Sequence, residues 1–456
     1  MRQAWISLAV LCSGSALGLL DSTMMNVALP AVSADLGAGI DELFWALNSY
    51  LLTATVPLVT SGRLGDLFGP KPLFLAGIVT FTLASLACGL ATTPGWLIAA
   101  RAVQGLGCAL FLPQGTTLVT QLFPPARRGA AWGVWGAVSG AAVAAGPAIG
   151  GFLVEPMGWR GIFLVNVPAG LLLTVLAVRL LPRRPVDRLR RFDLLGTVLL
   201  GLALFQIVFA LIEAAPWWLA GGALTLGAFL LVQRARQHTD PLVPFAVFSS
   251  RTFRLITLGQ TALPFGVSST VLLTLLHLQA GAGLSPLRAG LLSGVAPTVS
   301  ILFAPLSGRL TDRFGGGYVL LSGLGLMTVG CAVLGHAVWS GNGLLSGLVV
   351  FGIGMGVVFA PPGVLAMRDI EPGMAGAASG VFTLSGRIGG VVGTAVVGAV
   401  LKHLLPADAL AGRSISAEVS HAVAFAYTLP AVALAVAAVL ALAAESPSRR
   451  PARMPA

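Results

Sequence analysis

The sequence predicts an all-α membrane protein with fourteen transmembrane helices, and three observations carry that prediction. Of the 456 residues, 56% are hydrophobic and only 9% are charged, a balance that excludes an ordinary soluble globular protein. Apolar runs of about 20 residues, the length needed to cross the hydrocarbon core, alternate with short stretches rich in proline, glycine and charge. Most of the 27 basic residues fall in every second connection between these runs.

Fourteen apolar runs follow one another along the chain. The predicted spans cover residues 5–29, 42–61, 72–92, 96–118, 129–154, 161–181, 194–214, 217–233, 254–278, 287–308, 317–338, 343–367, 377–401 and 422–444. Because basic residues accumulate in cytoplasmic loops, their distribution places both termini in the cytoplasm and requires an even number of spans. The net charge of +11 does not indicate a nucleic-acid partner, because the arginines are not gathered on one face or helix.

An internal repeat divides the chain into two halves. The segment Gly62–Gly69 recurs as Gly308–Gly315, and the glycine-rich span 129–154 is matched by 377–401. Two halves of similar helical plan are typical of secondary transporters, in which the substrate site lies between the halves near the midplane. The predicted parts are an N-terminal six-helix half (1–181), a basic linker with two additional spans (182–250), a C-terminal six-helix half (251–444) and a basic cytoplasmic tail (445–456).

Asp21 is the most informative residue, because it lies inside the first apolar run, where an ionised side chain is costly. At 1.5 Å per residue, Asp21 lies ~13 Å and Arg101 of the fourth run ~9 Å below the outer ends of their spans. A buried arginine needs an acceptor and a buried aspartate needs a cation or a proton, so we expect the two to pair. The alternatives are that Asp21 only hydrogen-bonds a neighbouring helix or caps a kink, and that Arg101 binds backbone carbonyls.

The pair predicts a proton-coupled switch. A buried carboxyl group beside a guanidinium can gain and lose a proton as the helices rearrange, and protonation of Asp21 would release Arg101 to other acceptors. Gln104, one turn below Arg101, is a candidate partner of the pair. Asn26 lies off the helical stripe of Asp21, which leaves packing, a hydrogen bond to the fourth span and substrate contact as its alternative roles.

Arg387 in the span 377–401 is a second intramembrane cation that needs a partner, and the alternatives are substrate, Glu213 or a backbone carbonyl. Glu213 lies near the end of span 194–214, so it is either a substrate-cavity residue or an interfacial one. With two arginines inside the membrane against one acid, a dicationic substrate is disfavoured.

Two further groups of residues are candidates for conformational control. The first is a predicted switch loop in which glycines permit a tight turn, Asp66 accepts hydrogen bonds from exposed amides, and Arg63 and Lys71 face anionic headgroups. This loop and its repeat comprise Gly62, Arg63, Asp66, Gly69, Lys71, Gly308, Arg309 and Asp312. The second group is a candidate hinge, in which small residues let helices approach and a proline permits a bend, with ordinary small-residue packing as the alternative. It comprises Gly146, Pro147, Gly150 and Gly151.

In this order, these motifs resemble the major facilitator superfamily, specifically its fourteen-helix drug/proton antiporter branch. The segments that carry the resemblance are Leu20–Pro30, Gly62–Lys71, Arg101–Gly105, Gly140–Gly151 and Trp159–Pro168. The second of these departs from the usual family motif at Leu67 and Pro70, where the family has basic residues. The resemblance implies a proton-coupled secondary transporter of the bacterial cytoplasmic membrane that exports small amphipathic compounds by alternating access, as in multidrug efflux.

The expected partners are a small-molecule substrate, protons and the lipid bilayer, and the proton gradient takes the place of a cofactor. Because a single two-half chain needs no second copy to form a pathway, we expect a functional monomer. The alternative function is a transporter of the same fold for a dedicated metabolite or solute, by export or by proton symport. The sequence has no HExxH or GxSxG motif and no intramembrane acids paired at catalytic spacing, so we predict that it is not an enzyme.

Overall fold

The computed structural model describes residues 2–182, 193–213, 215–237, 243, 245–370, 375–405 and 417–445. In this part of the chain every regular element is a helix. This is the expected outcome for an apolar chain, because a helix satisfies its own backbone polar groups where no water is available.

The first eight helices form one bundle. They are α1 (Arg2–Leu36), α2 (Ile40–Thr55), α3 (Leu58–Phe68), α4 (Pro70–Gly89), α5 (Pro94–Leu122), α6 (Pro125–Met157), α7 (Gly161–Leu164) and α8 (Asn166–Leu180). Two more helices follow, α9 (Leu194–Ile212) and α10 (Pro216–Ala235).

A second bundle is built by the rest of the described chain. It contains the 3₁₀ turn η1 (Phe245–Ser249), α11 (Arg251–Leu276), the π-helical turn η2 (His277–Gly281), α12 (Pro286–Ser293), α13 (Val295–Phe314), α14 (Gly316–Ser340), α15 (Leu344–Val357), α16 (Pro361–Met367), α17 (Ala375–Leu404), α18 (Ala417–Ala426) and α19 (Thr428–Glu445).

Twelve helical segments of the described residues are long and apolar enough to cross a membrane, rather than the fourteen predicted from the sequence. The two predicted spans that do not meet this standard are 42–61 and 194–214. The first is interrupted between α2 and α3 at Pro57, because proline lacks the N–H that would continue the hydrogen-bond ladder. The second, in α9, offers a shorter apolar stretch, Leu195–Leu211.

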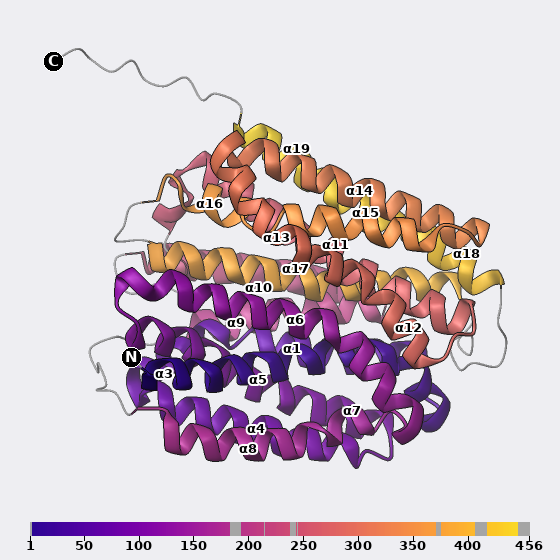
Figure 1. Ribbon diagram of the computed structural model, residues 1–456, viewed down its shortest axis with the longest axis horizontal. Coiled ribbons are helices and arrows are strands. Elements are labelled where there is room, and N and C mark those ends of the chain that lie inside the picture. Colours follow the sequence, from indigo (N-terminus) through magenta and orange to yellow (C-terminus); the bar gives the residue numbers. More distant parts are fainter. Residues whose placement is uncertain are drawn as a thin grey trace.

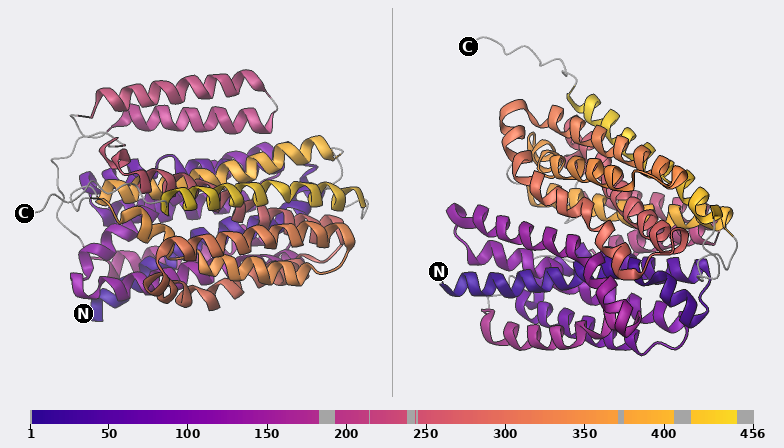
Figure 2. Two further views of the ribbon diagram at one scale, coloured as in Figure 1. Left: turned by 90° about the horizontal axis from the view of Figure 1, so that it is seen from above. Right: turned by 45° about the vertical axis from the view of Figure 1, so that its right-hand side comes forward.

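The two bundles lie side by side, and α1 begins and α19 ends at the same end of the molecule (Figures 1 and 2). The bundles diverge at that end and meet at the opposite end. We call these the open end and the closed end. The helices α9 and α10 form an antiparallel pair beside the bundles (Figure 2, left), where α9 packs against α2 and α17.

The closed end is held partly by polar contacts between α2 and α17. Lys402 Nζ lies 2.7 Å from a carboxylate oxygen of Asp41, with both side chains about one-third exposed. Deeper in the interface, the Thr394 hydroxyl donates a hydrogen bond of 2.8 Å to Asn48 Oδ1, and both of these residues are buried. These contacts must break if the closed end is to open.

We expect Asp41→Asn to open the closed end more often. An ion pair this exposed contributes about 0.2–1 kcal/mol, so its loss shifts the equilibrium up to about fivefold. The measurement is the rate at which a soluble maleimide labels a Thr394→Cys variant in detergent, with and without Asp41→Asn; every background then lacks the hydrogen bond from Thr394 to Asn48, so the comparison reports on the ion pair alone. His403→Gln, an exposed change beside Lys402, serves as the matched control. Equal labelling rates in all three backgrounds would show that the ion pair does not hold this end closed.

The segment predicted as a switch loop is helical, which corrects the sequence-based prediction. Gly62 lies inside α3 and its counterpart Gly308 lies inside α13. Only the glycine after each helix turns the chain, with φ of 92° at Gly69 and 87° at Gly315. Glycine adopts this backbone region without the steric cost of a side chain. The internal repeat is therefore the C-terminal part of a helix followed by a single glycine, Gly69 or Gly315, at which the chain turns into the next helix.

The cationic side chain of Lys71 also differs from its predicted role. Its Nζ donates hydrogen bonds to the carbonyl oxygens of Val178 (2.8 Å) and Leu181 (2.5 Å), at the C-terminal end of α8. A cation stabilises this helix end by satisfying free carbonyls and the negative end of the dipole. Among the other charged residues of the predicted switch, Arg309 is exposed, and the side chains of Arg63, Asp66 and Asp312 lie outside the described part of the structure.

Candidate functional site

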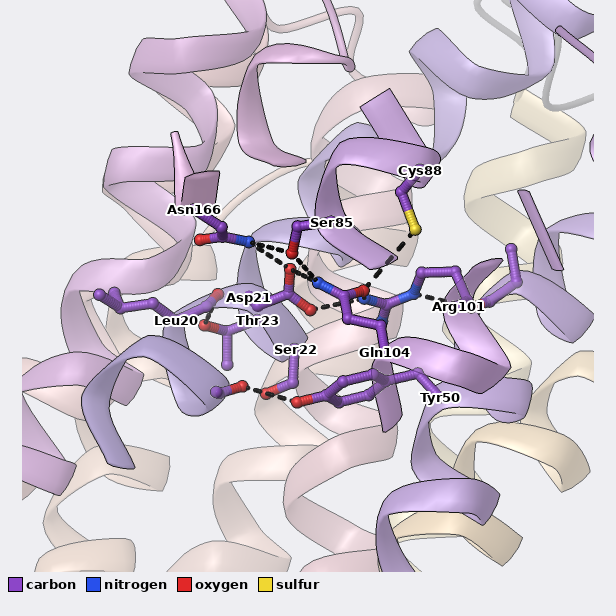
Figure 3. A network of polar contacts seen from close by, with 12 residues as sticks. Leu20, Asp21, Ser22, Thr23, Tyr50, Ser85, Cys88, Arg101, Gln104 and Asn166 are labelled. Carbon is purple, nitrogen blue, oxygen red and sulfur yellow. Dashed lines mark hydrogen bonds and ion pairs between the residues drawn. The ribbon is translucent and has the colours of Figure 1, made fainter. Parts of the chain in front are cut away.

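Asp21 lies in the interior of the first bundle, in contact with Arg101. One Asp21 carboxylate oxygen, Oδ2, lies 2.5 Å from Arg101 Nη1, and each side chain is only 1% exposed (Figure 3). The pairing of α1 with α5 at matched depth, inferred from the sequence, is what the structure shows. Truncating one partner of such a pair leaves an uncompensated buried charge, so the two residues depend on each other.

The second oxygen of Asp21 is held by two side-chain amides. Oδ1 accepts hydrogen bonds of 2.8 Å from both Gln104 Nε2 and Asn166 Nδ2, and Gln104 Oε1 accepts one of 2.7 Å from Arg101. Ser85 Oγ joins the group, 2.7 Å from Gln104 Nε2. Because every group that contacts the carboxylate is a donor, the arrangement matches the ionised, acceptor-only form of Asp21.

The guanidinium of Arg101 is enclosed on its other sides. Its Nε donates to the carbonyl oxygen of Ala46 at 3.2 Å, and the group lies 4.2 Å from the ring centroid of Tyr50. Tyr50 in turn donates a hydrogen bond of 3.0 Å to the carbonyl oxygen of Gly18. A cation over an aromatic face is stabilised further when it is removed from water. We call Asp21, Ser85, Arg101, Gln104 and Asn166 the buried polar cluster.

Five helices supply the buried polar cluster and the residues around it, namely α1, α2, α4, α5 and α8. A change in the charge of Asp21 would therefore alter contacts between helices that are distant in the sequence. Reasoning from the sequence found Asp21, Arg101 and Gln104 but missed Asn166, Ser85 and Tyr50. Asn166 carried a usable signal, because it is a polar residue within the apolar run 161–181.

A second feature is a cavity of about 800 Å³ between the two bundles towards the open end, which we call the inter-bundle cavity. It is lined by parts of α1, α3, α5, α6 and α17, including Leu19, Trp135 and Thr383. Arg387 of α17 lines it as well and is partly exposed there. Its guanidinium makes no hydrogen bond or ion pair with any residue that the structure describes.

Two other residues proposed for the substrate cavity lie elsewhere. Glu213 accepts a hydrogen bond of 3.0 Å from Trp45 Nε1 and joins the end of α9 to α2, so it is not the partner of Arg387. Asn26 donates to the carbonyl oxygen of Ser22 in its own helix at 3.4 Å. Neither Asn26 nor Glu213 is among the described residues that line the inter-bundle cavity. Substrate contact was only one of the roles that the sequence left open for these two residues, because helix rotation cannot be read from a nearly continuous apolar pattern.

The candidate hinge residues lie where α6 packs closely on α1 and α12. A Cβ atom added to Gly146 would lie 1.8 Å from Thr23 Oγ1, and one added to Gly151 would lie 2.3 Å from the carbonyl oxygen of Pro286. Gly150 faces Met24 at 3.1 Å in the same way. The helix continues through Pro147. Small-residue packing thus explains these glycines in this conformation.

The fold and the site define a multi-pass membrane transport protein rather than an enzyme. The chain belongs to the Major Facilitator Superfamily, whose family model matches residues 11–394. It is 37% identical over 432 residues to a probable actinorhodin transporter of Streptomyces coelicolor, covering 89% of this chain and 74% of that protein. It is 33% identical over 397 residues to the multidrug resistance protein Stp of Mycobacterium tuberculosis, covering 85% and 74%. Among solved structures, a POT family transporter in complex with a thioalcohol-conjugated peptide superposes with a TM-score of 0.71 at 16% identity, covering 96% of each chain.

Proposed function

We propose that this protein is a proton-coupled antiporter that exports small amphipathic compounds by alternating access. The observation that carries the proposal is Asp21, a carboxylate 1% exposed inside a helical bundle, whose three donors include a guanidinium at 2.5 Å. An ionisable group inside a membrane is costly, and residues of this kind usually serve a function such as proton transfer. The similarity to a protein named for multidrug resistance supports export of drug-like compounds.

In this proposal, protonation of Asp21 is the step that changes the conformation. A proton on the carboxyl group removes the counter-charge of Arg101 and turns one acceptor oxygen into a donor, so the three hydrogen bonds donated by Arg101, Gln104 and Asn166 can no longer all be kept. The helices that carry these residues then rearrange. The described conformation, with its donors all directed at the carboxylate, corresponds to the deprotonated protein ready to take up substrate at the open end.

The finer topology is part of the same proposal. We propose fourteen spans, with α2 and α3 together forming the second and α9 pairing with α10 to cross the membrane beside the two bundles. With an even count, both termini lie in the cytoplasm and the open end faces inward, as the distribution of basic residues requires. The two bundles then correspond to the halves 1–181 and 251–444, joined by 182–250, and the protein acts as a monomer in the bacterial cytoplasmic membrane. The candidate hinge at Gly146 and Pro147 would govern closure between them.

The test is transport by the purified protein in proteoliposomes that contain a cationic, a neutral or an anionic dye. We expect an acidic exterior to accelerate the exit of transported dyes, because protons enter as substrate leaves. Nigericin, which collapses the pH gradient, should abolish the acceleration, and protein-free liposomes are the control. Movement of dye together with protons would instead support symport, and no effect of the gradient on any dye would reject proton coupling.

A dedicated substrate is the second candidate function. It is favoured by the similarity to a protein named as a probable actinorhodin transporter. The dye panel separates the two candidates, since a dedicated transporter should move few or none of the chemically unrelated dyes and a multidrug transporter several of them.

A further inference from the structure

The inter-bundle cavity combines one charged group with an otherwise neutral surface. Its described lining contains apolar side chains, several hydroxyl groups and a single ionisable residue, Arg387. A volume of about 800 Å³ is within the range typical of small-molecule sites, which are mostly apolar with a few polar groups that orient the ligand.

The charge of Arg387 is not neutralised by the residues that the structure describes. It makes no ion pair with them, and the carboxylate of the buried polar cluster, that of Asp21, is already occupied by Arg101, Gln104 and Asn166. Asp21 does not line the cavity. A partly dehydrated guanidinium without a counter-charge is costly, and it favours an anion that can accept two parallel hydrogen bonds.

The neutral part of the lining suits a flat aromatic body. The indole ring of Trp135 is held against α5, where a Cβ atom added to Gly115 would lie 2.5 Å from the ring. Leu19, Leu58 and Leu112 contribute further apolar surface from three other positions. Aromatic rings gain from offset or edge-to-face contact with an indole, beyond the burial of their area.

Hydroxyl groups complete the cavity on both sides of the interface. They belong to Ser15, Thr116, Thr117 and Ser139 of the first bundle and to Ser379 and Thr383 of the second. The hydroxyls of Thr116 and Thr117 donate to the carbonyl oxygen of Pro113, so their oxygens can accept hydrogen bonds from the phenol groups of an oxygenated ring system. Arg387 and Thr383 lie one turn apart on α17, so a ligand bound to both would contact the second bundle by its polar end.

We propose that the inter-bundle cavity selects aromatic organic anions, with Arg387 binding the acidic group, Trp135 contacting the ring system and the hydroxyls binding ring oxygens. This inference rests on the proposed function, because it names the substrate class of the same transporter. It makes the ligand itself the partner of Arg387.

The experiment uses three probes with one ring system and different charges: 2-anthroate, 2-anthracenecarboxamide and 2-(aminomethyl)anthracene in its cationic form. Binding to the full chain is measured by equilibrium dialysis in nanodiscs of phosphatidylcholine, with empty nanodiscs as the reference for partition into lipid. We expect wild-type protein to bind the anion at least about tenfold more tightly than the cation, from the strength of charge-assisted hydrogen bonds.

Two substitutions at Arg387 then identify the group responsible. Arg387→Gln should lose about tenfold in affinity for 2-anthroate and keep the affinity for the amide within about twofold. Arg387→Lys should retain part of the anion preference, since it keeps the charge and loses the bidentate geometry. Arg288→Gln, which removes an exposed arginine from α12, controls for net charge.

The outcomes separate this inference from the proposed function. Equal affinity of wild-type protein for the three probes, or an equal loss for all three in Arg387→Gln, would overturn the proposed selectivity. If Arg387→Gln does not fold, the wild-type ranking and the Arg387→Lys variant decide. Proton-driven transport without charge preference would leave the antiporter standing and remove the anion selectivity. Anion-selective binding, together with transport that does not respond to a pH gradient, would support the anion selectivity and reject proton coupling.

Discussion

Asp21→Asn is expected to abolish uphill, proton-driven transport and to leave binding and downhill exchange of substrate measurable. The amide has nearly the shape of the carboxylic acid and fits the space among Arg101, Gln104 and Asn166, but it leaves Arg101 without its counter-charge, so we expect a folded protein of lower stability. It cannot take up or release a proton, and the energy of the gradient is then not coupled to substrate movement. The measurement is net dye exit from proteoliposomes with an acidic exterior and the same dye concentration on both sides, compared with exchange of the same dye at equal pH.

Two control variants sharpen this expectation. Glu155→Gln removes an exposed acid near the end of α6 and should transport like the wild-type protein. Asp21→Glu keeps an ionisable carboxyl group but displaces it by one methylene, and should retain part of the gradient-driven rate. If Asp21→Asn still carries out wild-type uphill transport, the coupling role belongs to another group.

The second large effect is expected on stability. Arg101→Gln leaves the Asp21 carboxylate buried without its cation, and loss of one partner of a buried ion pair costs about 3–5 kcal/mol. The double variant Asp21→Asn/Arg101→Gln removes both charges and should be more stable than Arg101→Gln alone. The free energy of unfolding is measured by titration with sodium dodecyl sulfate in mixed micelles. Its values for the wild-type protein, the two single variants and the double variant give the coupling energy between Asp21 and Arg101.

If Asp21 and Arg101 contributed independently to stability, the loss of unfolding free energy in the double variant would equal the sum of the losses in the two single variants. That result would contradict the mutual dependence of the pair. Arg288→Gln, on the exposed face of α12, should change the free energy of unfolding by no more than about 0.5 kcal/mol.

The buried polar cluster and the inter-bundle cavity give the protein two sites with different tasks. The cluster lies wholly within the first bundle, whereas the cavity is lined by both bundles. A proton would therefore act on the packing of one bundle, and the substrate would bridge the two. Coupling between them requires that protonation and substrate binding favour different arrangements of the same helices.

Some of the site followed from sequence because it depends on local chemistry. An acid in one apolar run and an arginine in another, at similar distances from the same end of their spans, predict an ion pair because each buried charge needs a partner. The repeat of Gly62–Gly69 at Gly308–Gly315 was also visible, although its helical form was not. A run of glycines and charges is typical of loops, but most of the segment Gly62–Gly69 is helical and packs against α5.

The sequence alone determined that this chain is an all-α membrane protein with an internal repeat and predicted a buried Asp21–Arg101 pair, because hydropathy and the cost of an isolated charge act locally along the chain. Tertiary structure decided the rest. It brought Asn166 and Ser85 to Asp21, tied Lys71 to the end of α8 and placed Arg387 in the cavity between the bundles. These positions depend on helix rotation and on contacts between distant segments, and no periodicity within a single apolar run records them.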